Sequence, residues 1–290
     1  MSYVIKYEGD NMMRKVTHKT KGQKAIDGAG VHLVRVLGNT TTDVHDPFLM
    51  LDAFDSTNPD DYTAGFPMHP HRGIETITFV SKGQMLHQDH LGTEALVGDG
   101  EAQWLTAGSG AEHAEFPGGE RMLGTQLWLN LPAKDKITAP PAYHSITTDE
   151  IKEFSLDGGF LRLMAGEYNG EEGWQGKYLP VDFYDIHLEP NTKVEIPVKE
   201  GRSAFVFTLL GDVVISGDVV LEKTAAKLSD GDHVIFETKD NGAEILLYSS
   251  KRLDEPVAWA GPIVMNTREE LNQAFEDLAN GTFIKKQAEY

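Results

Sequence analysis

Short apolar runs separated by Gly, Pro, Asn and Asp recur along the chain from about residue 30 to residue 260. They are rich in β-branched and aromatic residues, and helical periodicity is nearly absent among them. Examples are VHLVRVLG (31–38), TITFVSKG (76–83), GTQLWLNLP (124–132) and AFVFTLLG (204–211). Runs with this spacing are typical of the strands of a sandwich or barrel. The sequence therefore predicts an all-β protein.

One segment near the end departs from this pattern. Thr267 followed three residues later by Glu270 has the form of a capping box, which marks the start of a helix. Apolar residues then recur at helical spacing, namely Leu271, Ala274, Phe275, Leu278 and Ala279. Gly281 supplies a stop signal. We expect a helix at about residues 267–280 that packs this apolar stripe against the strands and has a structural role.

The strand pattern is interrupted near residue 145. After GTQLWLNLP comes the Pro-containing stretch AKDKITAPPAYHS, which is suited to a connector. The parts on either side have similar β-rich character, although no clean residue-level repeat relates them. The sequence therefore predicts two halves, residues 1–145 and residues 146–290.

Composition limits the classes of partner. The chain carries 45 acidic and 26 basic residues, a formal net charge of −19, and no cysteine. Such a charge disfavours direct binding to DNA or RNA, and the lack of cysteine excludes disulfides and thiolate metal sites. No apolar run approaches the roughly 18 residues of a membrane span, and the charged first segment does not resemble a secretory signal. We expect a cytoplasmic protein that contacts neither nucleic acid nor membrane directly.

The first segment with distinctive chemistry is GFPMHPHRGIETITFV, residues 65–80. His69 and His71 are two apart, so on a strand both side chains point to the same face. Continued alternation would place Glu75 on that face and Thr78 on the other. Two imidazoles inside a barrel are costly to bury without partners, and a metal ion is the simplest partner. The alternative is a pair of surface or hydrogen-bonded histidines.

The second segment is GEAQWLTAGSGAEHAEFPGG, residues 100–119. His113 and Glu115 are again two apart and would share one face of a strand, with glycine-rich turns on each side. Together the two segments offer three neutral nitrogens and one carboxylate. This donor set suits a first-row divalent metal, and iron, manganese, nickel, copper and zinc are all compatible with it. Four ligands also leave positions open in an octahedral shell, as a catalytic site requires.

The stretch HPHRGIETITF followed by VGDGEAQWLTAGSGAEHAE resembles the two metal motifs of the pirin family within the cupin superfamily. The ending AWAGPIVMNTREELNQAFEDLANGTF is similar to the pirin C-terminal signature, so the resemblance runs from about residue 30 to residue 283. It implies two tandem cupin barrels, that is, double-stranded β-helix or jelly-roll domains, followed by the C-terminal helix.

The resemblance also implies a ligand set, in which His69, His71, His113 and Glu115 hold one divalent metal with iron as the first choice. The general cupin pattern, H-x-H-x₃-E and a later His, would instead nominate Glu75. We favour Glu115 because the pirin motif is the closer match, and we keep Glu75 as an inner neighbour or occasional ligand.

What the resemblance implies about activity is the cleavage of flavonols such as quercetin at the 2,3 bond by O₂, with loss of carbon monoxide. Glu115 would act as the general base for the flavonol 3-hydroxyl, and the partners would be a small aromatic substrate and O₂. Pirins are also associated with transcriptional co-regulation through protein partners, so the alternative is a non-catalytic, metal- or redox-responsive interaction protein. A weaker third reading is a cupin isomerase or storage protein with an inert metal.

Several further residues near the motifs allow more than one interpretation. His87 and His90 fall on the next predicted strand, where we expect exposed side chains, although either one could line the pocket. Three aromatic residues are candidates for a pocket entrance, with plain core as the alternative: Trp104, Phe116 and Trp128.

The second half is similar to a cupin that has lost its metal. GRSAFVFTLLG (201–211) stands where a first motif would, yet it contains no histidine. LSDGDHVIFE (228–237) resembles the second motif's turn, but its single His233 has no partner. No metal site is therefore expected in the second half.

Overall fold

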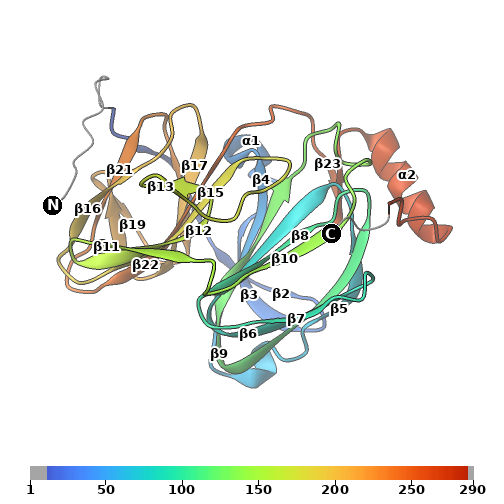
Figure 1. Cartoon of the computed structure of the whole chain (residues 1–290), viewed down its shortest axis with the longest axis horizontal. Coiled ribbons are helices and arrows are strands. Elements are labelled where there is room, and N and C mark those ends of the chain that lie inside the picture. Colours follow the sequence, from blue (N-terminus) through green and yellow to red (C-terminus); the bar gives the residue numbers. More distant parts are fainter. Residues whose placement is uncertain (1–11, 287–290) are drawn as a thin grey trace.

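The computed structural model describes residues 12–286, so the outermost residues of the two predicted halves, 1–11 and 287–290, lie outside it. Strands dominate, and they form two β-barrels that lie side by side (Figure 1). The all-β prediction is confirmed. Within the described range, no helix is both long and apolar enough to cross a membrane.

The first barrel is built around one large antiparallel sheet (Figure 1). Its strands lie in the order β10 (Ala142–Ile146), β8 (Glu101–Thr106), β6 (Ile74–Asp89), β9 (Ala111–Asn130), β4 (Phe48–Ser56), β3 (Val31–Leu37) and β2 (Gln23–Asp27). Two shorter strands extend it, β5 (Phe66–His71) beside β9 and β7 (Glu94–Val97) beside β6. The long strands β6 and β9 form the centre of this barrel.

The second barrel consists of two sheets. The larger has the order β1 (Val16–Lys21), β20 (Thr224–Leu228), β17 (Ser203–Leu210), β22 (Ala243–Ser250), β15 (Val181–Leu188), β12 (Gly159–Ala165) and β11 (Lys152–Leu156). The smaller has the order β16 (Lys193–Pro197), β21 (His233–Glu237), β18 (Val213–Ile215) and β19 (Asp218–Val220). The early strand β1 pairs with β20, so the start of the described chain belongs to the larger sheet of the second barrel and not to the first barrel.

Several short elements complete the fold. They are α1 (Thr42–His45), the 3-10 turn η1 (Pro59–Asp61), the hairpin of β13 (Glu167–Tyr168) and β14 (Glu171–Glu172), and the hairpin of β23 (Ala258–Ala260) and β24 (Ile263–Met265). The β23–β24 hairpin returns the chain to the first barrel, where Val264 donates a backbone hydrogen bond to the carbonyl of Arg72.

The large sheets of the two barrels pack face to face and share a hydrophobic core. Phe79 of the first barrel meets Phe183 of the second with ring centroids 5.7 Å apart, and Phe48 meets Phe205 at 4.9 Å. Alternation along β15 places Phe183 on this shared face, while Tyr184 points into the second barrel. Burial of such large aromatic pairs holds the two halves together.

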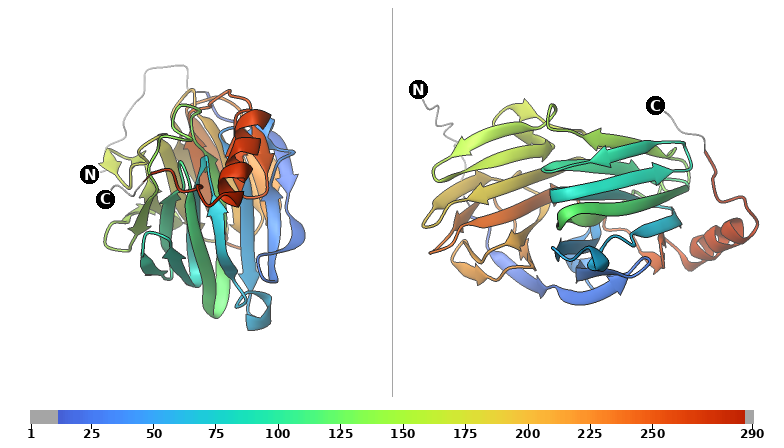
Figure 2. Two further views of the ribbon diagram at one scale, coloured as in Figure 1. Left: turned by 90° about the vertical axis from the view of Figure 1, so that its right-hand side faces the viewer. Right: turned by 90° about the horizontal axis from the view of Figure 1, so that it is seen from below.

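The C-terminal helix α2 (Arg268–Ala279) lies at the end of the molecule beside the first barrel (Figure 2). The predicted capping box is confirmed, because the Thr267 side chain accepts from Glu270 N–H and the Glu270 carboxylate accepts from Thr267 N–H. Leu271 and Ala274 are buried as expected. Phe275, however, is 39% exposed, and the inward position is taken by the buried Asp277, which forms an ion pair with Arg72.

Candidate metal centre

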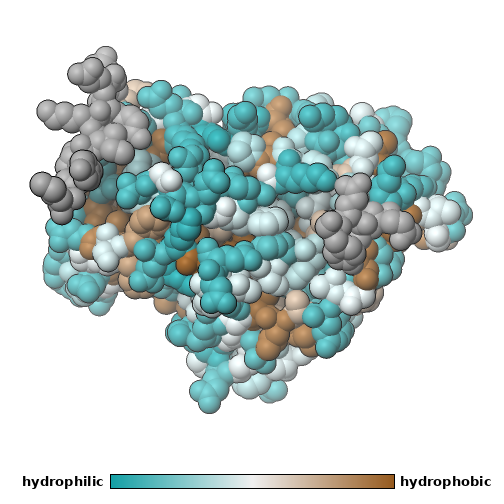
Figure 3. Space-filling model, viewed as in Figure 1, coloured by the Kyte–Doolittle hydropathy of each residue, from teal (hydrophilic) through white to brown (hydrophobic). Residues whose placement is uncertain are grey.

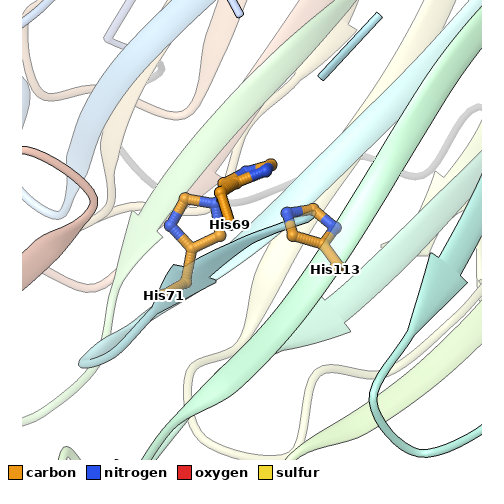
Figure 4. Close-up of side chains that lie close together, drawn as sticks. All are labelled: His69, His71 and His113. Carbon is orange, nitrogen blue, oxygen red and sulfur yellow. The ribbon is translucent and has the colours of Figure 1, made fainter. Parts of the chain in front are cut away.

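Strands β5 and β9 bring three histidines together inside the first barrel (Figure 4). His69 on β5 is the direct register partner of His113 on β9, and His71 follows two residues later on the same face of β5. One ring nitrogen from each histidine lies within 4.8 Å of the others. Antiparallel pairing of the two motifs thus produces the convergence that the sequence predicts.

Backbone carbonyls fix the tautomers of two of these rings. The Nδ1 atom of His69 lies 2.8 Å from the Pro67 carbonyl oxygen, and Nδ1 of His71 lies 3.0 Å from the Pro262 carbonyl oxygen. Because a carbonyl only accepts, each Nδ1 must donate, which leaves the lone pairs on the two Nε2 atoms. These Nε2 atoms are 3.0 Å apart. Two facing lone pairs repel each other unless a cation lies beside them, so the arrangement fits a metal ion.

The third ring, His113, supports the same conclusion. It is fully buried, and neither of its nitrogens has a hydrogen-bond partner among the described residues. Burial, together with the neighbouring histidines, holds the pKa of His113 well below its usual value. Burial and the proximity of His69 lower the pKa of His71 to about 3. Both rings are therefore neutral near pH 7, which is the form that ligates metals.

Glu115 lies two residues beyond His113 on β9, fully buried inside the same barrel. Its carboxylate accepts hydrogen bonds from Thr78 Oγ1 at 2.9 Å, from Gln103 Nε2 at 2.6 Å and from Gln126 Nε2. It is not one of the residues whose ligand atoms converge within 4.8 Å. The structure therefore places Glu115 next to the histidine cluster, held by other side chains.

The two glutamine amides that hold Glu115 are themselves oriented. Trp128 Nε1–H donates to Gln126 Oε1 at 3.3 Å, and Tyr143 Oη–H donates to Gln103 Oε1 at 3.1 Å. Each amide then presents its NH₂ group to the Glu115 carboxylate. Gln103, Gln126 and Tyr143 were not nominated from the sequence, because they come from three different strands and share no motif.

Glu75 lies on the opposite face of the sheet, so the expected alternation across residues 69–79 was wrong. Gly73 separates β5 from β6 with a φ of +81°, a conformation that favours glycine, and the side-chain alternation shifts there. As a result Thr78 points to Glu115, whereas Glu75 accepts a hydrogen bond from Thr106 Oγ1 at 2.6 Å. Burial raises the pKa of Glu75 to about 7.

The expected exposure of His87 was also wrong. Its ring is fully buried, stacks on Tyr143 with centroids 4.3 Å apart, and lies 5.4 Å from the His113 ring. The Nε2 atom of His87 is 3.1 Å from Asp89 Oδ2. His90 is half-buried, and its Nδ1 accepts from the Glu112 backbone N–H at 3.1 Å. Only His87 therefore adjoins the cluster.

A cavity of about 570 Å³ opens in front of His69 and His71. Its apolar wall includes Trp128, whose ring lies 4.9 Å from that of His71, and Trp259 from β23, 5.6 Å from Trp128. Trp104 belongs to the core between the barrels, and Phe116 is half-buried and does not line this cavity. Of the three predicted entrance aromatics, only Trp128 has that role.

Another part of the cavity wall is charged. Arg35 donates to Asp52 from both Nε at 2.9 Å and Nη2 at 2.7 Å, and it also contacts Asp27 at 2.7 Å. Asp52 is almost fully buried, and this burial raises its pKa despite the guanidinium. Two carboxylates against one guanidinium leave this wall with an acidic balance.

Buried cations anchor the strands that carry the histidines. Arg72 donates to the carbonyl of Ser109, to Asp277 of α2 and to the carbonyl of Phe283, so it joins both motifs to the C-terminal segment. Lys136 donates to the Gly73 carbonyl at 2.8 Å and thereby holds the break between β5 and β6. The C-terminal signature thus supports the cluster without contributing a ligand.

Two β-barrels in tandem, with a histidine cluster inside the first one, define a bicupin able to hold a metal ion. Sequence models of two domains match this chain: "Pirin" over residues 30–129 and "Pirin C-terminal cupin domain" over residues 183–284. The chain belongs to the pirin family, and the tandem cupin fold implied by the motifs is confirmed.

Individual relatives agree with this membership. A "Pirin-like protein" of Caulobacter vibrioides is 41% identical over 278 residues, covering 93% of this chain and 99% of the relative. A Pseudomonas aeruginosa protein named "Putative quercetin 2,3-dioxygenase" is 38% identical over 279 residues, covering 92% and 97%. Among solved structures, quercetin 2,3-dioxygenase of Acinetobacter baumannii is 31% identical, with a TM-score of 0.85 and coverage of 94% and 99%.

Proposed function

We propose that this chain is a metal-dependent dioxygenase that cleaves flavonols such as quercetin at the 2,3 bond. The observation that carries the proposal is the convergence of three histidines, two of which line a cavity of about 570 Å³ whose wall includes two tryptophans. A flat polyphenol fits such a wall, because an aromatic face packs well on indole rings. The names of the relatives support the same reaction.

In this proposal His69, His71 and His113 hold one divalent metal, with iron as the first choice and manganese, nickel, copper or zinc as alternatives. The chemistry that such a metal supplies is Lewis acidity toward a substrate oxygen and redox chemistry with O₂. Glu115 is the proposed fourth ligand when it turns toward the histidines. The overall reaction balances, since both atoms of O₂ enter the ring-opened product while one ring carbon leaves with its oxygen as carbon monoxide.

Glu115 also provides the proposed general base. Its carboxylate would take the proton of the flavonol 3-hydroxyl, which requires it to leave at least one of its three hydrogen-bond donors. Gln103 and Gln126 then remain to hold the released side chain inside the barrel. Trp128 and Trp259 would orient the substrate and exclude water from the reacting oxygen.

The test is O₂-dependent loss of quercetin, with detection of carbon monoxide, on protein reconstituted separately with each of the five metals. We expect turnover with at least one metal and a loss of at least about 100-fold in Glu115→Gln, the lower range for a general base. Glu112→Gln is the matched control, because Glu112 lies on the same strand and its contacts to His90 are made by the backbone. Full turnover in Glu115→Gln would exclude the assigned role.

A protein-interaction role remains the alternative outcome of the same experiment. Stoichiometric metal binding without turnover for any metal would favour it. The face of the molecule shown in Figure 3 is largely hydrophilic, with apolar residues scattered in small groups, so it offers no broad apolar surface for a partner. The cavity thus remains the better-supported place for function.

A further inference from the structure

A second group of metal-ligating side chains lies in the second half of the chain, outside the barrel interior. Asp185 and His187 stand two residues apart on β15, and Glu244 on β22 is the register partner of His187. One ligand atom from each of the three lies within 4.8 Å of the others. Alternation along β15 places them on the sheet face that turns away from the apolar interior and toward the first barrel.

The group contains a buried acceptor that no described side chain or backbone atom satisfies. Glu244 is only 5% exposed, and its Oε1 atom has no hydrogen-bond partner among the described residues. Asp185 is fully buried, and its Oδ1 atom lies 3.0 Å from His187 Nε2. An unpaired carboxylate oxygen in the interior is costly, so Glu244 Oε1 indicates a missing positive partner.

The neighbouring cations do not fill this place. Arg162 reaches only the other carboxylate oxygen of Asp185, at 3.3 Å. Lys223 is engaged by Asp55 at 2.9 Å and by the Leu209 carbonyl. His187 Nε2 lies 3.0 Å from both oxygens of Asp185, close enough for all three atoms to share one ion.

The group is also reachable from solvent. His187 has 32% of its side chain exposed, and a cavity of about 290 Å³ is lined by His187 and Glu244. The ring of Phe160 stacks on that of His187 with centroids 4.5 Å apart and 14° between planes, which fixes the imidazole in position. Water in this cavity would complete the coordination of a bound ion.

We propose that Asp185, His187 and Glu244 form a second divalent-cation site, selective for a transition metal such as zinc or manganese. One imidazole and two carboxylates are ligands that Zn²⁺ and Mn²⁺ both accept, whereas Ca²⁺ and Mg²⁺ prefer oxygen ligands alone. The two carboxylates outweigh the single guanidinium of Arg162, so the local charge favours a dication. The site is independent of the catalytic proposal and lies where the second half faces the first.

The experiment is titration of metal-free, full-length protein with Zn²⁺, followed by calorimetry and by metal analysis after gel filtration. We expect two equivalents per chain, falling to one in Glu244→Gln and in His187→Asn, two variants that preserve side-chain size. His144→Asn is the matched control, because His144 forms an ordinary pair with Glu150 at 2.8 Å near the surface, and it should retain two.

Anomalous diffraction at the zinc edge gives an independent readout for variants that fold poorly. A peak between the side chains of Asp185, His187 and Glu244 in the unmodified protein would support the site. A single equivalent in the unmodified protein, with no anomalous peak at these residues, would overturn it. Unchanged stoichiometry in both substituted variants would do the same and would identify the group as an ion-pair network between the barrels.

Discussion

Both barrels are cupin domains, but their interiors differ in polarity. The first encloses a polar layer, in which Thr78, Gln103 and Gln126 surround Glu115 beside the histidines. The second encloses an apolar cluster of aliphatic and aromatic side chains that includes Val206, Phe236 and Leu247. A buried polar layer contributes little net stability, since each hydrogen bond formed on folding replaces one to water. The comparison indicates that the first barrel provides the polar groups of the proposed site, whereas the second contributes mainly to stability.

The largest expected effect of a single change is at the metal cluster. His69→Ala removes one of three converging ligands, and we expect the metal bound at this cluster, and turnover, to fall to background. The half-buried position of His69 should leave the fold intact. His233→Ala is the control, because His233 occupies the corresponding motif of the second barrel and pairs with Asp232 instead. Metal analysis at matched circular dichroism would decide, and unchanged metal at the three-histidine cluster in His69→Ala would refute the ligand set.

The next prediction compares how much a substitution in each barrel interior lowers the free energy of unfolding. Phe236→Ala leaves a cavity in the fully buried cluster of the second barrel, and we expect it to lower the free energy of unfolding by about 3–5 kcal/mol. Thr78→Val, which removes one donor to Glu115 in the first barrel, should cost only about 1 kcal/mol. Chemical denaturation measures both values. Similar losses in the two variants would contradict the division between a chemical and a structural interior.

Much of this contrast could be read from the sequence, because it depends on local patterns. Each of these patterns spans only a few residues: the strand runs, the capping box at Thr267, and the motifs around His69 and His113. Each is confirmed as a structural feature. The lack of histidine in residues 201–211 likewise agrees with the apolar interior of the second barrel.

What the sequence could not supply depends on geometry between distant segments. The φ of +81° at Gly73 reversed the expected side of Glu75, because a strand break cannot be located from alternation alone. The burial of His87 follows from its stacking on Tyr143, and the place of Trp259 in the cavity follows from the return of β23 to the first barrel. Asp185, His187 and Glu244 match no motif because two strands contribute them.

An intermediate effect concerns a buried histidine that is not in either cluster. His45 of α1 is fully buried against Phe205, with ring centroids 5.5 Å apart, and burial lowers its pKa to about 3. An unfolded chain binds a proton at this ring near pH 6.5, whereas the folded chain does not until near pH 3. Stability is therefore lost as pH falls through this window, by about 2 kcal/mol between pH 7 and pH 5.

His45→Leu removes this proton uptake. The free energy of unfolding of the variant should therefore fall by about 2 kcal/mol less than that of the parent between pH 7 and pH 5. Denaturant unfolding at pH 7 and pH 5 measures this difference. Metal-free protein is used, because the histidine cluster then contributes equally to the variant and the parent. An identical pH dependence in the variant and the parent would show that His45 is protonated in the folded state or does not limit stability.

The smallest expected effect concerns the charged wall of the cavity in the first barrel, and it assumes the proposed reaction. The buried carboxylate of Asp52 can accept hydrogen bonds from hydroxyl groups of a polyphenol, which an apolar interior cannot do. We expect Asp52→Asn to raise KM for quercetin about 10-fold, with less change for a flavonol that lacks hydroxyls on its pendant ring. Asp55→Asn is the control, because Asp55 lies on the same strand but pairs with Arg121 and Lys223 outside the cavity. An equal change for both substrates would mean that Asp52 only positions Arg35, and that the polar interior recognises the substrate through other groups.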